Sequence, residues 1–523
     1  MIVLRLRQIA LLLAAFAICG IAFYQMFYRV NGSFPGEYAM GLGITAALSL
    51  VFWILVTRLL PYASQVVQPC VLLLTGIGVL MIARIDHENE TSVALRQIMF
   101  VCIAIVLCAA LVIGLKDYRV LRRFSYVSMV VGLVLLLSPM LPVLGQEING
   151  ARIWIKIPGI GQIQPGEFAK LFLAFFFAAY LFDHRDQLAV GGRKVLGFRL
   201  PRIRDLGPII IVWAVSMGVL VLQRDLGTSL MFFAMFVSML YVATGRKSWI
   251  VIGLGVFVAG AVAASSVFSH VGNRINAWLH PFDPDVYNAV GGSEQIAKGV
   301  FGLAAGGLSG TGLGQGHPYI TPLSFSDFIY ASVGEELGLA GVLAVLMLYL
   351  IIIATGMVTA MKIKDGFGKL LASGLVFTMA FQVFTVVGGV TLVIPLTGLT
   401  MPYMAAGGSS LLANMLLLSL LIVISNAANK PQPDTTSETF QYEALAVLRE
   451  QEVKERAEQV RKQEAQNAMA TQVIATRPVA PVAPGDGEPD AGEPDRDTHR
   501  QPRLDDGMIE DERRRAGTQG GNA

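Results

Sequence analysis

Twelve apolar runs, each about long enough to cross a lipid bilayer, constrain the fold of this chain more than any other feature. They lie at residues 8–28, 38–60, 64–83, 95–115, 124–145, 167–183, 207–223, 227–244, 248–268, 336–357, 368–390 and 407–426. A helix of about 20 apolar residues spans the hydrocarbon core. Because lipid offers no hydrogen bonds to the backbone, each run is expected to be a helix. Some runs are short, so ten or eleven spans also fit. The sequence predicts an all-α, polytopic integral membrane protein of about twelve helices.

Composition excludes the other broad classes. With 54% hydrophobic and 15% charged residues, the chain is too apolar for an ordinary soluble domain. The twofold alternation of membrane barrel strands is absent. All four cysteines fall within apolar runs, which favours simple packing over a disulfide framework or a metal site.

The distribution of basic residues predicts the orientation. Lys and Arg are dense in the loops at 116–123, 184–206, 245–247 and 358–367, and sparser in the longer loops that alternate with them. Cytoplasmic loops carry such an excess. We therefore expect a multi-pass protein of the cell membrane with both termini in the cytoplasm.

Residues 430–523 form a tail of different composition. From residue 431 on, it has 12 Lys and Arg against 19 Asp and Glu, hence a net charge of −7. Residues 438–475 are rich in helix formers with opposite charges at close spacing, which predicts a helix. Beyond Arg477, Pro, Gly and Asp dominate and predict disorder. We expect this tail to bind cytoplasmic regulators, and the chain to bind no nucleic acid.

Two predicted outer loops are long, at about 146–166 and 269–335, and the second is too long for a plain connector. It contains GVFGLAAGGLSGTGLGQG at 299–316. This stretch lacks the GK[ST] ending of a phosphate-binding P-loop. Close helix packing or a half-inserted segment is the favoured interpretation.

Ionisable and aromatic residues at the outer ends of the runs are the candidate site residues, since charge at membrane depth usually has a function. They are Trp154 with Arg152, Glu167 with Lys170, Arg224 before Asp225, the loop cation Lys298, and Asp327. Each has a structural alternative: an interfacial anchor for Trp154, an ion pair for Glu167 and Lys170, and a helix cap for Asp225 and Asp327.

Three carboxylates lie together in TPLSFSDFIYASVGEELG, residues 321–338. Asp327 precedes an apolar segment, where it suits either a helix N-terminus or a general base. Glu335 and Glu336 follow and could equally cap the next span. No His, Asp or Glu spacing matches a standard metal motif. From the residues alone, the chain is a transporter, a lipid-handling enzyme or a scaffold with a polar outer cavity.

Five stretches together resemble the SEDS family of RodA/FtsW-type cell-wall polymerases. They are NGARIWIKIPGIGQIQPGEFAK, QRDLGTSL, GGLSGTGLGQG, SDFIYASVGEELGLAG and PLTGLTMPYMAAGGSSLLAN. The resemblance covers residues 95 to 426 and is greatest to actinobacterial RodA-type members. It divides the chain into additional N-terminal helices (1–94), a catalytic membrane core (95–429) and the tail.

The resemblance implies a peptidoglycan glycosyltransferase that polymerises lipid II during cell elongation or division. A class B penicillin-binding protein would be its transpeptidase partner and membrane lipid its surroundings. Asp327 matches the family's essential aspartate, and Trp154, Glu167 and Lys170 match family positions. For the pyrophosphate we expect Arg152, Lys170, Arg224 and Lys298, with a divalent cation (Mg²⁺ or Mn²⁺) as a further aid. The active site would face outward.

Two rival functions stay open at this stage. A lipid II flippase needs polar residues through the whole membrane depth, whereas here they cluster at the outer end. A non-catalytic scaffold is favoured only by departures from the family pattern, such as Phe325-Ser326 before Asp327 and Tyr319 where many members have Glu.

Overall fold

The computed structural model describes residues 2–148, 150–157, 161–185, 194–195, 198–199, 203–431, 448–449 and 451–463. The chain divides into two compact units, 1–431 and 432–523. Within the second unit, residues 448–449 and 451–463 are helical, as expected for the predicted tail helix. The rest of that helix and the segment predicted to be disordered lie outside the described residues.

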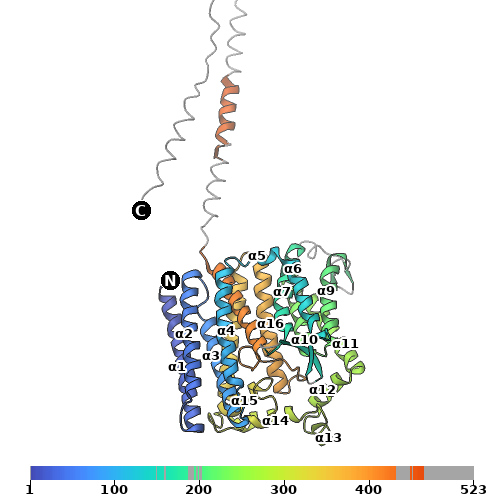
Figure 1. The fold of residues 1–523 in the computed structure, drawn as a ribbon. Helices are drawn as coiled ribbons and strands as arrows, with labels where there is room; N and C mark the ends of the chain where they lie inside the picture. The colour runs from blue at the N-terminus through green and yellow to red at the C-terminus, as the bar shows by residue number, and fades with distance from the viewer. Residues whose placement is uncertain are drawn as a thin grey trace, which may run out of the picture. The chain divides into compact units, whose positions relative to one another are not determined.

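Twelve apolar helices occupy the twelve predicted positions, so the helical membrane fold is confirmed (Figure 1). In the described part of the chain, ten are long and apolar enough to cross a membrane, and α6 and α9 have shorter apolar stretches, Ser125–Met140 and Gly207–Leu222. The ten are α1 (Ile2–Asn31), α2 (Gly36–Leu59), α3 (Val67–Asn89), α4 (Val93–Gly114), α7 (Pro165–Asp183), α10 (Leu226–Thr244), α11 (Ser248–Val267), α15 (Ile329–Lys362), α16 (Gly366–Val390) and α17 (Gly408–Asn429). The shorter two are α6 (Ser125–Leu137) and α9 (Ile203–Leu222).

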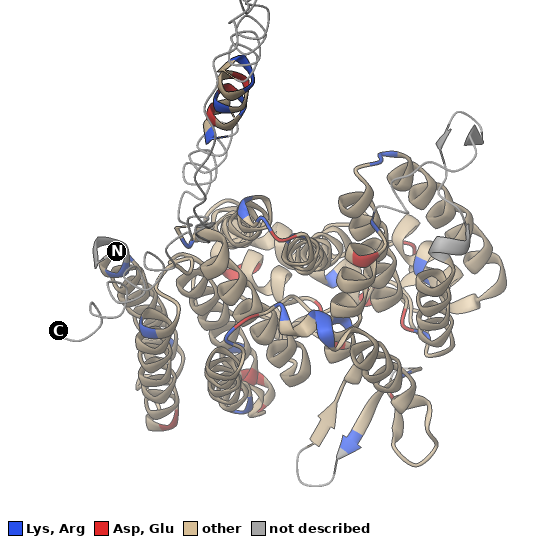
Figure 2. Ribbon diagram, turned by 90° about the horizontal axis from the view of Figure 1, so that it is seen from above, with Lys and Arg blue, Asp and Glu red and all other residues tan. Residues whose placement is uncertain are grey.

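Short elements fill the loops. The helical ones are α5 (Val120–Arg123), α12 (Ser269–Leu279), α13 (Pro284–Tyr287), α14 (Glu294–Gly306), η1 (Ser138–Met140) and η2 (Pro318–Ile320). Strands β1 (Gly145–Ile148), β2 (Ala151–Ile157) and β3 (Gly161–Ile163) form an antiparallel sheet in the order β1-β2-β3, which the sequence analysis did not predict. A second pair, β4 (Lys194–Val195) and β5 (Phe198–Arg199), lies in another loop. In Figure 2 the three-stranded sheet projects from the side of the helices.

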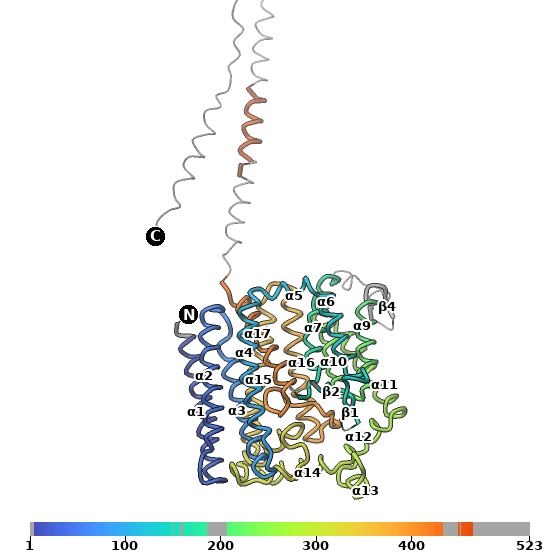
Figure 3. Tube along the Cα trace, viewed as in Figure 1, coloured from blue at the N-terminus to red at the C-terminus, as the bar shows by residue number. Residues whose placement is uncertain are grey.

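Burial distinguishes central from peripheral helices. Helices α3, α7, α16 and α17 are mostly buried, whereas α1, α2 and α11 bury little of their surface. The tube view shows α1 and α2 together at one edge of the bundle (Figure 3). Since the outer surface of a membrane protein faces lipid tails, apolar residues on it need no partner in the protein. The extra N-terminal helices therefore lie on a flank and leave the central helices to build the site.

The two ends of the bundle are distinct. Arg5 of α1 donates to the carbonyl of Leu60 after α2, and the Tyr62 backbone N–H donates to Asn426 of α17. The start of α1 and the ends of α2 and α17 therefore share one end. The loop elements α12, α13 and α14 lie at the opposite end (Figure 1). The start of α15, which contacts α14, lies there too.

Glycines in the long loop allow two backbones to touch. Gly338, inside α15, has φ 67° and ψ −167°, a conformation in which side chains are strained. A Cβ at Gly306 or Gly310 would collide with the carbonyl oxygens of Gly334 and Glu336. The interpretation of the glycine-rich stretch as a close-packing segment is therefore confirmed.

The carboxylates of Glu335 and Glu336 hold this contact in place. Glu336 is fully buried, accepts from the Gly314 backbone N–H at 3.0 Å and pairs with Arg84 of α3 at 3.2 Å. The Glu335 side chain accepts from the His317 backbone N–H at 2.5 Å. The glutamate pair thus joins α3, α15 and the glycine-rich loop, a structural role instead of simple capping.

Candidate active site

Asp327 lies in a turn just before α15, which begins at Ile329. Its carboxylate is partly buried, and Gly299 of α14 packs against the ring of the next residue, Phe328. A run of turns from Thr321 to Phe328 presents the aspartate at the loop end of the bundle, without a helix of its own. This placement puts a carboxylate at the edge of the apolar core.

Arg274 of α12 is the cation beside Asp327. A Cβ added at Gly398 would lie 3.8 Å from Arg274 Nη2 and 3.9 Å from Asp327 Oδ2, so both groups surround one point. Arg274 Nη1 also donates to the carbonyl of Thr397 at 3.0 Å. Gly398, with φ 74°, has no side chain to fill this space. The segment Pro395–Gly398 therefore forms one wall of a small charged site.

Electrostatics connect the same arginine to Asp225. Burial lowers the pKa of Arg274, while Asp225 and Asp327 both raise it. Asp225 caps α10 by accepting from the Thr228 backbone N–H at 2.9 Å, which confirms the capping interpretation. Burial also raises the pKa of Asp225. The charge of Arg274 therefore acts on two carboxylates.

Burial raises the pKa of Asp327 to about 6, although the Ser326 hydroxyl and the Arg274 guanidinium both favour its charged form. A carboxylate with a pKa near the working pH can accept a proton in one step and release it in the next. Perturbed carboxyl groups of this kind often mark functional sites.

The sheet places Arg152 and Trp154 near the same turn. The Arg152 backbone N–H donates to the carbonyl of Gln223, which directly precedes Arg224 and Asp225. Arg152 Nε is buried without a hydrogen-bond partner. Side chains two apart on a strand share a face, so Trp154 lies on the face of Arg152. Arg224 is exposed in the turn, with φ 60°.

Glu167 and Lys170 form a buried polar group inside the bundle. Lys170 Nζ donates to Glu167 at 2.6 Å, to Asn414 at 3.2 Å and to Gln382 at 3.3 Å. The Lys170 side chain is only 1% exposed. Its three protons thus all have protein acceptors. This is the ion pair of the structural alternative, and the predicted contact with a headgroup stays a prediction.

Gln382 passes this support to the site wall. Its amide nitrogen donates to the carbonyl of Thr400, two residues beyond Gly398. Through Gln382, Lys170 therefore supports the segment whose carbonyls accept hydrogen bonds from Arg274, the neighbour of Asp327.

Lys298 lies apart from these groups in the described structure. It pairs with Glu294 one turn earlier on α14, at 2.7 Å, and both side chains are partly exposed. Exposed pairs of this kind contribute little stability.

Arg274 is the site residue that sequence reasoning missed. Arg274 lies in the long loop 269–335 but is not among the candidate residues named from the sequence. The available signal was its place on a short amphipathic stretch, SHVGNRINAWL, which forms α12. Among the described residues, no group of three or more His, Cys, Asp or Glu is arranged to hold a metal ion.

Fold and site together define a polytopic membrane protein with an acid–base centre at one end of its helix bundle. A family model for FtsW, RodA and SpoVE, described as "Cell cycle protein", matches residues 37–430. The chain belongs to this family. The match includes α2 and α3, so a division at residue 94 stays a prediction.

Three curated relatives agree. "Peptidoglycan glycosyltransferase RodA" of Mycobacterium tuberculosis is 46% identical over 384 residues, 72% of this chain and 81% of the relative. That of Mycobacterium leprae is 44% identical over 410 residues, 75% and 86%. "Stage V sporulation protein E" of Bacillus subtilis is 31% identical over 367 residues, 68% and 94%.

One solved structure has a similar fold. It belongs to work on the coordination of polymerization and crosslinking by a peptidoglycan synthase complex. The TM-score is 0.55 at 25% identity, and the alignment covers 69% of this chain and 98% of the other.

Proposed function

We propose that this chain is a peptidoglycan glycosyltransferase that polymerises lipid II into glycan strands. The observation that carries the proposal is Asp327, a carboxylate with a raised pKa, beside the Arg274 guanidinium at one end of the bundle. The names of the mycobacterial relatives support the same activity.

Asp327 acts as the general base. The 4-hydroxyl of the incoming sugar is a poor nucleophile at neutral pH, and a positioned base accelerates its attack roughly 10²–10⁴-fold. Asp327 takes the hydroxyl proton as the oxygen bonds to C1 of the growing chain. The bond from C1 to the pyrophosphate breaks, and undecaprenyl pyrophosphate leaves with the electron pair.

Cations around Asp327 stabilise the leaving pyrophosphate, on which negative charge develops. Arg274 lies next to the carboxylate, and Arg152 has an unpartnered buried Nε–H. Arg224 is exposed in the adjoining turn. A planar guanidinium suits phosphate oxygens. We assign Arg274 and Arg152 to binding of the pyrophosphate and Arg224 to its approach. Lys298 and Lys170 do not contact the pyrophosphate and act on it only through neighbouring residues.

A divalent cation, Mg²⁺ or Mn²⁺, does not fit a dedicated protein cage here. Arg274 already supplies positive charge that acts on both Asp225 and Asp327. Mg²⁺ is commonly held by one or two carboxylates together with substrate phosphates and water. We therefore derive no step through a metal.

Topology and partners follow from the same proposal. The end that carries Asp327 faces outward, and the end with Arg5, the start of α1 and the end of α17 faces the cytoplasm. The transpeptidase partner is a class B penicillin-binding protein. The role is elongation more than division, because the RodA relatives are 44–46% identical to this chain and the resemblance is greatest to RodA-type members. The tail recruits cytoplasmic regulators.

The test uses purified protein with its transpeptidase, fluorescent lipid II and a gel that resolves glycan length. Wild type should form polymer and Asp327→Asn should form none. Asp365→Asn is the matched control, because Asp365 caps α16 at the opposite end of the bundle. Polymer from Asp327→Asn would refute the general base, and no polymer from wild type would favour the flippase or the scaffold.

A further inference from the structure

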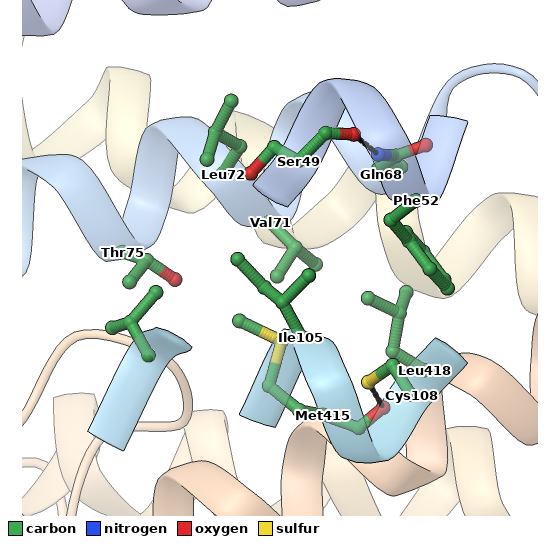
Figure 4. Close-up of a pocket in the computed structure, with 11 residues that line it drawn as sticks. Ser49, Phe52, Gln68, Val71, Leu72, Thr75, Ile105, Cys108, Met415 and Leu418 are labelled. Atoms are coloured by element: carbon green, nitrogen blue, oxygen red, sulfur yellow. Dashed lines mark hydrogen bonds between the residues drawn. The ribbon is translucent and has the colours of Figure 1, made fainter. Parts of the chain in front are cut away.

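Two adjoining cavities lie among the N-terminal helices, and Asp327 lines neither of them. The larger, of about 270 Å³, is enclosed by α1, α2, α3 and α4. The smaller, of about 30 Å³, extends it toward α17 (Figure 4). Leu72, Thr75 and Val101 line both. An engineered apolar cavity of roughly 150 Å³ suffices to bind benzene, so the larger one can hold a hydrocarbon.

The walls show why the space stays open. Helix α1 packs mainly on α3, and α2 mainly on α4, while α1 and α2 have few contacts with each other. Gly20 of α1 and Gly43 of α2 line the larger cavity, and a Cβ on either would meet nothing within 4 Å. The space therefore reaches the bilayer between two sparsely packed helices.

A line of polar groups leads from the smaller cavity to Arg5. Gln68 lines that cavity, accepts from Gln8 at 3.0 Å and donates to the Ser49 carbonyl at 3.2 Å. Gln8 in turn accepts from Arg5 at 2.6 Å. Arg5 is 7% exposed, its Nε has no partner, and its other acceptor is the Leu60 carbonyl.

No carboxylate pairs with Arg5 among the residues that the structure describes. Arg7 and Arg58, both exposed, belong to the same end of α1 and α2. Buried cations are normally paired with an anion. Within the described residues, this end therefore offers an unbalanced buried cation that an anionic group would stabilise.

We propose that this flank binds one anionic phospholipid of the leaflet on the Arg5 side, with its phosphate near Arg5 and one acyl chain in the cavities. On α3, Gln68 and Val79 lie about 16 Å apart at 1.5 Å per residue. One leaflet of hydrocarbon is about 15 Å thick. The cavities therefore have the length of an acyl chain.

Other occupants fit less well. A partner helix, about 10 Å across, is too wide for the larger cavity. Water needs several polar partners, and the large cavity is lined mainly by apolar groups, with hydroxyls only from Thr45 and Thr75. The hydroxyl of Thr75 has no partner, and Figure 4 shows it without a hydrogen bond.

The experiment is native mass spectrometry of the delipidated full chain, titrated with phosphatidylglycerol or phosphatidylcholine of identical acyl chains. Wild type should bind one phosphatidylglycerol tightly. Excluding only two methylene groups of the acyl chain from the cavity weakens lipid binding about tenfold. Gly20→Leu with Gly43→Leu should therefore lose at least that factor. The matched control is Gly255→Leu with Gly260→Leu, two equally open positions on α11. Equal binding by both doubles means adventitious lipid only and overturns the site.

Three further measurements test the headgroup assignment, the apolar occupant and the cavity separately. Arg5→Gln should remove the preference for phosphatidylglycerol, and an unchanged preference overturns the headgroup assignment. Thr75→Val should bind at least as well as wild type, whereas weaker binding indicates a polar occupant and overturns the acyl chain. If the Gly20→Leu, Gly43→Leu variant does not fold, as judged by its melting curve, the cavity is tested with wild type and a shorter lipid. A six-carbon acyl chain should bind more weakly, and equal affinity refutes the cavity. None of these readouts depends on glycan synthesis.

Discussion

Arg274→Gln tests whether the guanidinium holds Asp327 in its charged form. Both groups lie within 3.9 Å of one point beside Gly398, so they are at most about 8 Å apart. With an effective dielectric constant of about 20, a charge pair at that distance interacts by roughly 2 kcal/mol. This corresponds to about 1.5 pKa units, and salt reduces it to about one.

The sign follows from charge. Loss of a cation disfavours the carboxylate, so the pKa of Asp327 should rise from about 6 toward about 7. A protonated Asp327 cannot accept the hydroxyl proton. The rate of glycan formation should therefore fall on the acid side at a pH about one unit higher than in wild type.

The assay is the initial rate of glycan formation from saturating lipid II between about pH 5 and 8.5. The shape of the profile matters, because Arg274→Gln also weakens leaving-group stabilisation and lowers the rate at every pH. Asp225 and His270 lie near the same cations, so Asp225→Asn checks that the acid limb belongs to Asp327. Lys298→Gln removes a charge elsewhere and should leave the limb in place. An unshifted limb in Arg274→Gln refutes the coupling.

Three further predictions concern stability. Asp327→Asn should stabilise the protein at neutral pH by up to roughly 3 kcal/mol, because a carboxyl with a raised pKa destabilises the fold as pH rises from about 4 to 6. Melting curves at pH 5 and 7.5 should show that the gain in stability shrinks at the lower pH. A gain in stability that is independent of pH would contradict this. Glu336→Gln should cost up to about 3 kcal/mol, because the buried Arg84 keeps only the partly exposed Glu88 as its carboxylate partner, and the double change with Arg84→Met should recover much of this loss in chemical denaturation. Lys170→Met should destabilise by a similar amount, and adding Glu167→Gln should restore both melting temperature and activity if the pair is structural; restored folding without activity would instead support a substrate role.

The helices were predictable because bilayer thickness imposes a length that few other folds need. The three-stranded sheet was missed although its central strand, ARIWIKI, alternates with period two, because the flanking GQEI and GQI are too short to show strand alternation. The end of α6 was also beyond the pattern, because the apolar run 124–145 continues past Leu137, where this helix ends.

The site was predictable only in part. Asp327 stood out as a carboxylate next to an apolar run, whereas Arg274 looked like any loop cation because its partners lie 53 and 49 residues away in sequence. The same limit applied to Glu336, whose partner Arg84 comes from α3. Charges that meet only through tertiary folding leave no local pattern.

The left-handed residue inside α15 divides this helix into two parts. Gly338 separates a short segment that begins at Ile329, just after Asp327, from the longer part that runs to Lys362. Hydrogen bonds from the glycine-rich loop and the ion pair to α3 clamp the short segment. Side chains on the long part, such as Leu343 and Met347, face outward and are open to contact by other membrane proteins. The Leu339 and Ala340 N–H groups, directly after Gly338, also donate to the Gly307 and Leu308 carbonyls, so the glycine-rich loop splints both sides of the break and ties the long part of α15 to the segment that follows Asp327.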